Sequence, residues 1–252
     1  MKMITDKLKK LVNTVFWMLF TAKCKYCGEF IDKNETLCKE CAENLPVIRG
    51  EKCRYCGAEK SRCNCKKHKL NYDGITAPFY YEGGIKAAVR RLKFNRKLYL
   101  AEHLSDDMAR AVKEDFSDKS FDFMCFVPFS RVQVITRMYN QSEILAEGLS
   151  EKLNIPLKRA LVKLFDTKTQ HRMNMRGRKG NVFGVYDVAD GTDVKGKTIL
   201  LVDDVKTSGS TLDDCATILK IRGADEVYCV TVAIAGMKKK EEKEDEMEKT
   251  ES

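Results

Sequence analysis

Two adjacent carboxylates and the small-residue loop after them are the part of this sequence best equipped for chemistry. Asp203 and Asp204 follow the apolar run 199–202, and the loop comprises Lys206, Thr207, Ser208, Gly209, Ser210 and Thr211. Backbone N–H groups of such a loop, together with the positive end of a following helix, bind phosphate. The carboxylates can accept hydrogen bonds from vicinal hydroxyls or bind a metal ion through water. A ligand with a phosphate on one side and vicinal hydroxyls on the other would fit these groups, and ribose 5-phosphate is such a ligand.

A buried strand and a helix must position these groups. The apolar residues at 199–202 do not alternate with polar ones, which predicts a parallel strand covered on both faces. Residues 121–128 predict a second strand, ended by Pro128, and a helix is expected from about residue 140 to 153. The alternation of strands and helices through 71–236 predicts an α/β fold with a doubly wound parallel sheet.

Two other interpretations of this region are possible. The acidic pair could close an ordinary strand, with a Ser or Thr cap on the next helix, but the coincidence of two acids, a glycine and small hydroxyls favours a phosphate site. Residues 191–198 fit the text pattern of an ATP-binding P-loop. That loop must open a helix, whereas these residues lead into a strand, so we interpret them as a polar turn.

The acidic pair and its loop resemble the signature of the phosphoribosyltransferases, which bind phosphoribosyl pyrophosphate (PRPP) with Mg²⁺. The resemblance implies that Asp203 and Asp204 meet the ribose 2′- and 3′-hydroxyls and that the loop holds the 5′-phosphate. Lys206 departs from the pattern, since an apolar residue is more usual there. A lysine leaves the loop backbone intact and would add charge attraction for the phosphate.

Closely spaced cysteines between residues 24 and 65 predict two metal sites. The first set is Cys24, Cys27, Cys38 and Cys41, and the second is Cys53, Cys56, Cys63 and Cys65. Two Cys-x-x-Cys knuckles complete a tetrahedral zinc site with no open position, which indicates structure and not metal catalysis. The tight Cys63-Asn64-Cys65 spacing leaves His68 as an alternative ligand, and spacing alone leaves iron as an alternative metal. The other cysteines, Cys125, Cys215 and Cys229, are expected in the core.

Positive charge is moderate and locally concentrated. The formal net charge is +9; two tetrathiolate zinc sites of about −2 each would lower it to about +5. A basic loop over residues 170–181, in a stretch (158–179) with eight Lys or Arg against one Asp, would neutralise a departing pyrophosphate. A second basic stretch, 86–97, predicts an amphipathic helix that is either simply solvated or bound to nucleic acid.

Composition divides the chain into four segments. Residues 1–22 predict an amphipathic helix in preference to a signal peptide, and 23–70 the double zinc ribbon. Residues 71–236 predict the α/β domain, and 237–252 are almost wholly charged and expected to be disordered. No run of about twenty apolar residues predicts a membrane span. Clustered thiols favour a reducing, cytoplasmic location.

Further motifs narrow the resemblance to the ComF competence-protein family. They are the cysteine ribbon, Tyr81-Glu82-Gly83, Leu92-Lys93-Phe94, an Arg-x-x-Asn-Gln motif and a spaced Gln, Arg and Asn. The resemblance implies a type I phosphoribosyltransferase-like sheet with a zinc module and a role in DNA uptake during natural transformation. The additional PRPP- or phosphate-binding candidates are Arg131, Arg137, Asn140, Gln141, Gln170, Arg178 and Asn181.

Two classes of function follow. The chain is either an active phosphoribosyltransferase of nucleotide metabolism, acting on a base or an amine, or a ComF-like protein that keeps the PRPP site while acting in DNA uptake. The second function would add single-stranded DNA and a DNA-uptake helicase as partners. The resemblance favours a competence role, with turnover left open.

Overall fold

The computed structural model describes residues 22–32, 34–63, 65, 70–94, 99–129, 139–164 and 185–235. The predicted N-terminal helix lies outside these residues, apart from residue 22, and the charged segment 237–252 lies wholly outside them. Within the described part, no helix combines the length and apolar character needed to cross a membrane.

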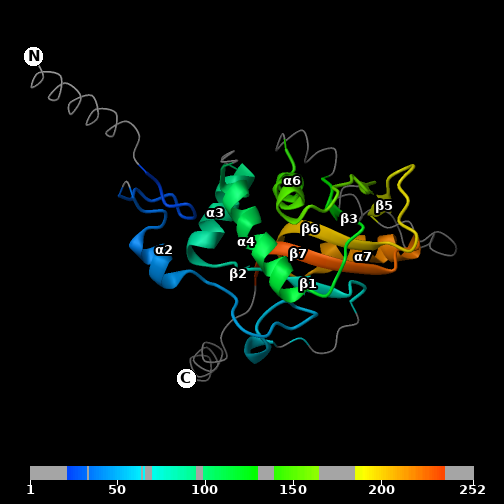
Figure 1. Cartoon of the computed structure of the whole chain (residues 1–252), viewed down its shortest axis with the longest axis horizontal. Coiled ribbons are helices and arrows are strands. Elements are labelled where there is room, and N and C mark those ends of the chain that lie inside the picture. Colours follow the sequence, from blue (N-terminus) through cyan, green and yellow to red (C-terminus); the bar gives the residue numbers. More distant parts are fainter. Residues whose placement is uncertain are drawn as a thin grey trace, which may run out of the picture.

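A parallel sheet forms the centre of the molecule (Figure 1). Its strands are β1 (Gly74–Thr76), β2 (Phe79–Tyr80), β3 (Phe123–Phe126), β6 (Thr198–Lys206) and β7 (Glu226–Ile234). The order is β1-β7-β6-β3, and β2 also pairs with β7. All of these pairings are parallel. The two strands predicted from their apolar runs are therefore neighbours in the sheet.

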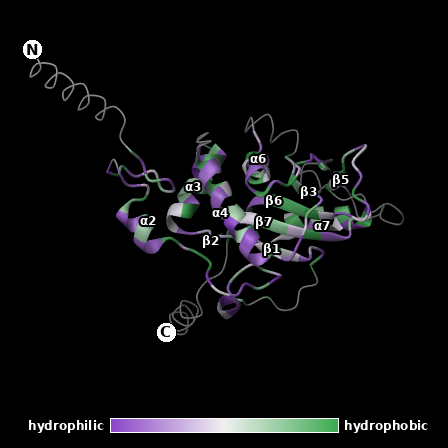
Figure 2. Cartoon of the chain, in the orientation of Figure 1, coloured by the Kyte–Doolittle hydropathy of each residue, from purple (hydrophilic) through white to green (hydrophobic). Residues whose placement is uncertain are grey.

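Strand β6 separates two hydrophobic cores because its successive side chains point to opposite faces. Leu200 and Val202 belong to one cluster, and Ile199 and Leu201 to the other. On the first face pack α3 (Gly83–Phe94), α4 (Tyr99–Asp115) and α6 (Gln141–Leu153); on the second packs α7 (Ser210–Ile221). Hydrophobic residues lie along the middle of β6, whereas hydrophilic residues are common in outer elements such as α2 (Figure 2).

The remaining elements are short. An antiparallel pair, β4 (Leu161–Lys163) and β5 (Tyr186–Val188), stands apart from the main sheet. The cysteine-rich segment contributes α2 (Lys39–Asn44) and the 3-10 helix η1 (Lys60–Arg62). The residues resembling a P-loop form turns that lead into β6, as the polar-turn interpretation requires. Cys125, Cys215 and Cys229 are fully buried core residues, as predicted.

Candidate functional site

The acidic pair lies at the carboxyl end of β6, where ligands bind in parallel α/β sheets. Asp203 Oδ1 accepts a hydrogen bond from Ser142 Oγ at 2.8 Å and another from the backbone N–H of Asp204 at 2.8 Å. Asp204 Oδ2 lies 2.7 Å from Lys93 Nζ, at the end of α3. One carboxylate is thus held by neutral donors and its neighbour by a cation.

These surroundings shift the proton equilibrium of Asp203. Burial and the charge of Asp204 raise its pKa, while the hydrogen bonds from Ser142 and the Asp204 backbone oppose that rise; the pKa reaches about 7. A carboxyl group with this pKa exchanges its proton near neutral pH, so it can both accept and donate a hydrogen bond to a ligand hydroxyl.

Residues 139–142 join α3, β3 and α6 beside the acidic pair. The Tyr139 hydroxyl donates to the carbonyl of Leu92, and Gln141 Nε2 donates to the carbonyl of Lys93 at 3.3 Å. These two bonds hold the last turn of α3, and with it Lys93, against the start of α6. The short segment therefore positions the cation that pairs with Asp204.

Asn140 and Gln141, two of the predicted phosphate-binding residues, hydrogen-bond to backbone groups in the structure. Asn140 donates through Nδ2 to the carbonyl of Val127 at 2.9 Å and accepts through Oδ1 from the Ser142 N–H at 3.0 Å, which caps α6. Both side chains are buried, Gln141 with 1% exposed and Asn140 with 8%. These hydrogen bonds join α3, β3 and α6 at this point.

The small-residue loop is a tight turn between β6 and α7. The strand continues through Lys206, two residues beyond the acidic pair, and the helix begins at Ser210. Gly209 has φ +87°, a left-handed conformation that costs other residues about 1–2 kcal/mol. Thr207 and Ser208 are exposed. This geometry leaves their hydroxyls and the first turn of α7 accessible to an anion.

Lys206 differs most from the expectation. It is buried, with 5% exposed, and is the last residue of β6 instead of the first residue of the loop. The charged groups that act on it are the second set of cysteines, which raise its pKa while the larger effect of burial lowers it. Lys206 therefore belongs to the buried end of β6, under the influence of the cysteines.

Sequence reasoning did not assign Lys93 and Ser142 to this site. The available signal was topological: β3 and β6 were both predicted as parallel strands, so the helix after β3 had to begin near the carboxyl end of β6. The other candidates lie outside the described residues: Arg131, Arg137, Gln170, Arg178, Asn181 and the alternative zinc ligand His68.

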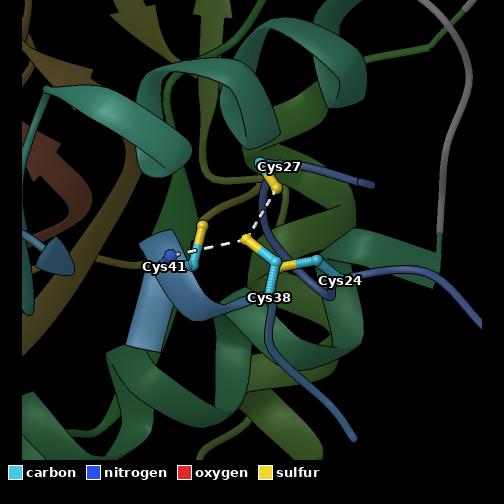
Figure 3. Close-up of side chains that lie close together, drawn as sticks. All are labelled: Cys24, Cys27, Cys38 and Cys41. Carbon is cyan, nitrogen blue, oxygen red and sulfur yellow. Dashed lines mark hydrogen bonds between the residues drawn. The ribbon is translucent and has the colours of Figure 1, made fainter. Parts of the chain in front are cut away.

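The first cysteine cluster brings four Sγ atoms together within 4.8 Å of one another (Figure 3). Cys27 and Cys38 Sγ are 3.5 Å apart, close to the roughly 3.8 Å expected between thiolates on one tetrahedral zinc ion. Burial raises the pKa of the Cys24 thiol, but backbone hydrogen bonds from Cys38, Tyr26 and Cys27 outweigh it and bring the pKa to about 6. Burial instead raises the pKa of the Cys27 and Cys41 thiols, so the fit to zinc rests on the four converging sulfur atoms.

The second cluster consists of Cys53, Cys56, Cys63 and Cys65, again within 4.8 Å of one another. The Sγ–Sγ distances are 3.4 Å for Cys53–Cys65 and 3.6 Å for Cys56–Cys63. Cys63 and Cys65 thus both contribute sulfur atoms despite their tight spacing. The donor set fits a tetrahedral zinc ion held by four thiolates.

The comparisons with known proteins agree with these two parts. The family described as "Double zinc ribbon domain" matches residues 15–70, and that described as "Phosphoribosyl transferase domain" matches residues 135–251. The predicted zinc sites and phosphoribosyltransferase-like sheet are thereby confirmed.

Related proteins extend over most of the chain. "Competence protein F" of Haemophilus influenzae is 26% identical over 82% of this chain and 95% of its own. "DNA utilization protein YhgH" of Escherichia coli K12 is 26% identical over 82% of this chain and 88% of its own. "Competence protein ComFC" of Bacillus subtilis is 23% identical over 75% and 80%.

Among solved structures, the allosteric regulatory enzyme of purine biosynthesis is 24% identical and covers 52% of this chain and 25% of its own, with a TM-score of 0.39. The ribbon, the phosphoribosyl transferase domain and the relatives that share both along most of their length lead to one assignment. The chain is similar to proteins of the ComF family in both parts and along most of its length, which agrees with the resemblance of its sequence motifs.

Proposed function

We propose that this chain binds PRPP with Mg²⁺ at the carboxyl end of β6 and acts in DNA uptake. The observation that carries the first part is the placement of Asp203 and Asp204 beside the exposed turn that opens α7. The names of the relatives, which refer to competence and DNA utilization, support the second part.

The proposed roles follow from the chemistry of each group. The 5′-phosphate would accept hydrogen bonds from the turn, that is, from backbone N–H groups and hydroxyls of residues 207–211. The ribose 2′- and 3′-hydroxyls would donate to the acidic pair. Mg²⁺ supplies charge compensation for the pyrophosphate. Lys93, which pairs with Asp204, would pair with a pyrophosphate oxygen when ribose hydroxyls occupy the carboxylate.

Turnover would need no protein nucleophile. An amine or ring nitrogen of the acceptor would form a bond to C1 of the ribose while the bond from C1 to the pyrophosphate oxygen breaks, and the acceptor nitrogen would lose its proton. Positioning and charge stabilisation by the site suffice for such a transfer. This is the alternative function, an active phosphoribosyltransferase in nucleotide metabolism.

Single-stranded DNA and a DNA-uptake helicase are the proposed partners, and the cytoplasm is the proposed location. Helix α3 exposes Lys86 and Arg90 on one side, and Phe94 at its end is 63% exposed. Cations beside an aromatic ring suit a DNA backbone and a stacked base. The proposal treats residues 23–70 as the ribbon module and 71–236 as the PRPP-binding domain.

Calorimetric titration of the zinc-loaded protein with PRPP and Mg²⁺ tests the ligand. Saturable binding is expected for the wild type, and Asp204→Asn is expected to weaken it. Absence of heat at all PRPP concentrations, confirmed by a second binding method, would refute the PRPP site. Pyrophosphate release with candidate acceptors separates a transferase from a binding protein.

The partner proposal has its own test. Fluorescence anisotropy with single-stranded DNA should show binding that falls steeply as salt increases. A double variant, Lys86→Glu with Arg90→Glu, should abolish it, whereas Lys113→Glu with Lys195→Glu, two exposed lysines away from α3, serves as a charge-matched control. Equal DNA affinity for both variants would exclude α3 as the contact.

A further inference from the structure

Lys206 is a buried cation without a carboxylate partner among the described residues. It terminates β6 with 5% of its surface exposed. The ion pairs of the described residues include no contact to its ammonium. Burying an ammonium without a counter-charge is costly, so some other negative group must account for its place.

The second cysteine cluster is the source of negative charge that acts on Lys206 in the structure. Lys206 pairs in register with Ile234 on β7. Ile234 packs in one hydrophobic cluster with Cys53 and Cys56, and its Cδ1 would lie 2.6 Å from a Cβ at Gly57, inside the knuckle. The end of β6 and the second cluster therefore meet across β7. The cysteines of this cluster raise the pKa of Lys206, opposing the larger effect of burial.

The same lysine touches the proposed phosphate-binding turn. A Cβ placed on Gly209 would lie 3.2 Å from Lys206 Cε and 3.6 Å from the Tyr72 hydroxyl. That hydroxyl donates to the carbonyl of Tyr55 at 2.6 Å. Tyr55 stands between Cys53 and Cys56 in the knuckle. Lys206 and Tyr72 thus both lie against the turn, and each connects the turn to the second cluster.

We propose that Lys206 is a positioning residue that provides the counter-charge of the second zinc site and, with Tyr72, holds the phosphate-binding turn against it. Four thiolates and Zn²⁺ carry a net charge of about −2, so one adjacent ammonium offsets half of it. Zinc occupancy of this ribbon thereby stabilises the turn at the end of β6. The counter-charge role of Lys206 does not depend on the proposed PRPP binding. The effect on the turn does rest on the proposed PRPP site.

Zinc affinity tests the counter-charge. Chelator competition, read by native mass spectrometry as zinc ions per chain, compares wild type with Lys206→Met, Lys206→Arg and the exposed control Lys113→Met. Lys206→Met should lower the affinity for one zinc ion by about tenfold or more, the usual effect of losing a group next to metal ligands. Lys206→Arg should restore the affinity, and Lys113→Met should leave it unchanged.

A double-mutant cycle assigns the affected ion. Cys65→Ser removes the second site, so Lys206→Met in that background should leave the remaining zinc unaffected. Unchanged affinity for both ions in Lys206→Met would overturn the proposal. If Lys206→Met lowers the affinity for the remaining zinc ion in the Cys65→Ser background, the proposal is also overturned, because the lysine would then act on the first site.

PRPP calorimetry tests the link to the turn. Lys206→Met, Tyr72→Phe and Cys65→Ser should each weaken PRPP binding. Wild-type PRPP affinity in Cys65→Ser, together with weakened binding in Lys206→Met, would refute the link and show that the lysine acts on phosphate directly. Absence of PRPP binding by the wild type would refute the proposed function and the link with it, while the zinc measurements would still decide the counter-charge.

Discussion

Asp203 and Asp204 are neighbours in sequence, yet the fold gives their carboxylates different partners. Asp203 receives donors that are neutral, from Ser142 and a backbone N–H, whereas Asp204 receives the ammonium of Lys93. Burial and the adjacent charge then raise the pKa of Asp203 to about 7. Burial and the neighbouring carboxylate thus outweigh the opposing charge of Lys93 at Asp203.

Asp203→Asn should stabilise the protein increasingly as the pH rises. The unfolded chain releases this proton near pH 3.8 and the folded protein near pH 7, so the folded state binds more protons between those values and stability contributed by Asp203 falls with rising pH. Asparagine cannot ionise. The gain of the variant in free energy of unfolding should grow by about 1 kcal/mol from pH 6 to pH 8 and then level off.

Urea unfolding at several pH values measures this gain. Asp204→Asn is the matched control: it removes the acceptor of the Lys93 ion pair and should lower stability without the same growth. A difference between Asp203→Asn and wild type that stays constant from pH 6 to pH 8 would contradict the raised pKa.

At the scale of elements, local sequence patterns predicted individual strands and helices but not the contacts between distant segments. The apolar runs predicted β3 and β6, and the polar segment after β3 predicted the start of α6. Nothing in the spacing of Asn140 and Gln141 shows that α3 ends beside them, because that contact joins residues far apart in sequence. The burial of Lys206 had no local signal, because the two-residue alternation of β6 does not continue to its end: Val205 packs on the same cluster as Leu200 and Val202.

Tyr139→Phe tests the junction of α3 and α6. The hydroxyl donates to the carbonyl of Leu92, and its loss should lower the free energy of unfolding by about 1 kcal/mol. PRPP affinity should also fall, because Lys93 loses part of its support. Tyr99→Phe, which alters an exposed ring at the start of α4, is the control for urea unfolding and calorimetry. Unchanged PRPP affinity in Tyr139→Phe would remove this junction from the site.

At the scale of the molecule, the zinc ribbon and the sheet domain share one folded body. The Tyr26 hydroxyl, next to the first knuckle, donates to Asp107 Oδ2 of α4 at 2.6 Å, and the Tyr26 ring packs on Phe79. Ile234 of β7 packs on the second cluster. The cysteine spacing predicted both clusters, but the docking surfaces depend on three-dimensional packing that no local pattern encodes.

Tyr26→Phe should destabilise the whole protein and not only the ribbon. The hydroxyl satisfies a buried carboxylate, and such a bond contributes about 1.5–3 kcal/mol. Tyr55→Phe is the matched control because the Tyr55 ring is 46% exposed. Circular dichroism should show one cooperative transition, shifted to lower temperature in Tyr26→Phe alone. A ribbon that melts separately, with the sheet domain unchanged, would contradict a shared body.

The most direct test of the PRPP site is ³¹P NMR of PRPP with Mg²⁺ and the zinc-loaded protein. The 5′-phosphate and the pyrophosphate give separate resonances, so the spectrum reports which group the turn holds. The 5′-phosphate resonance should shift or broaden with wild type, and Gly209→Val, which places a side chain where φ is +87°, should suppress the effect. A 5′-phosphate resonance that stays at its free position, whether or not the pyrophosphate shifts, would contradict the account.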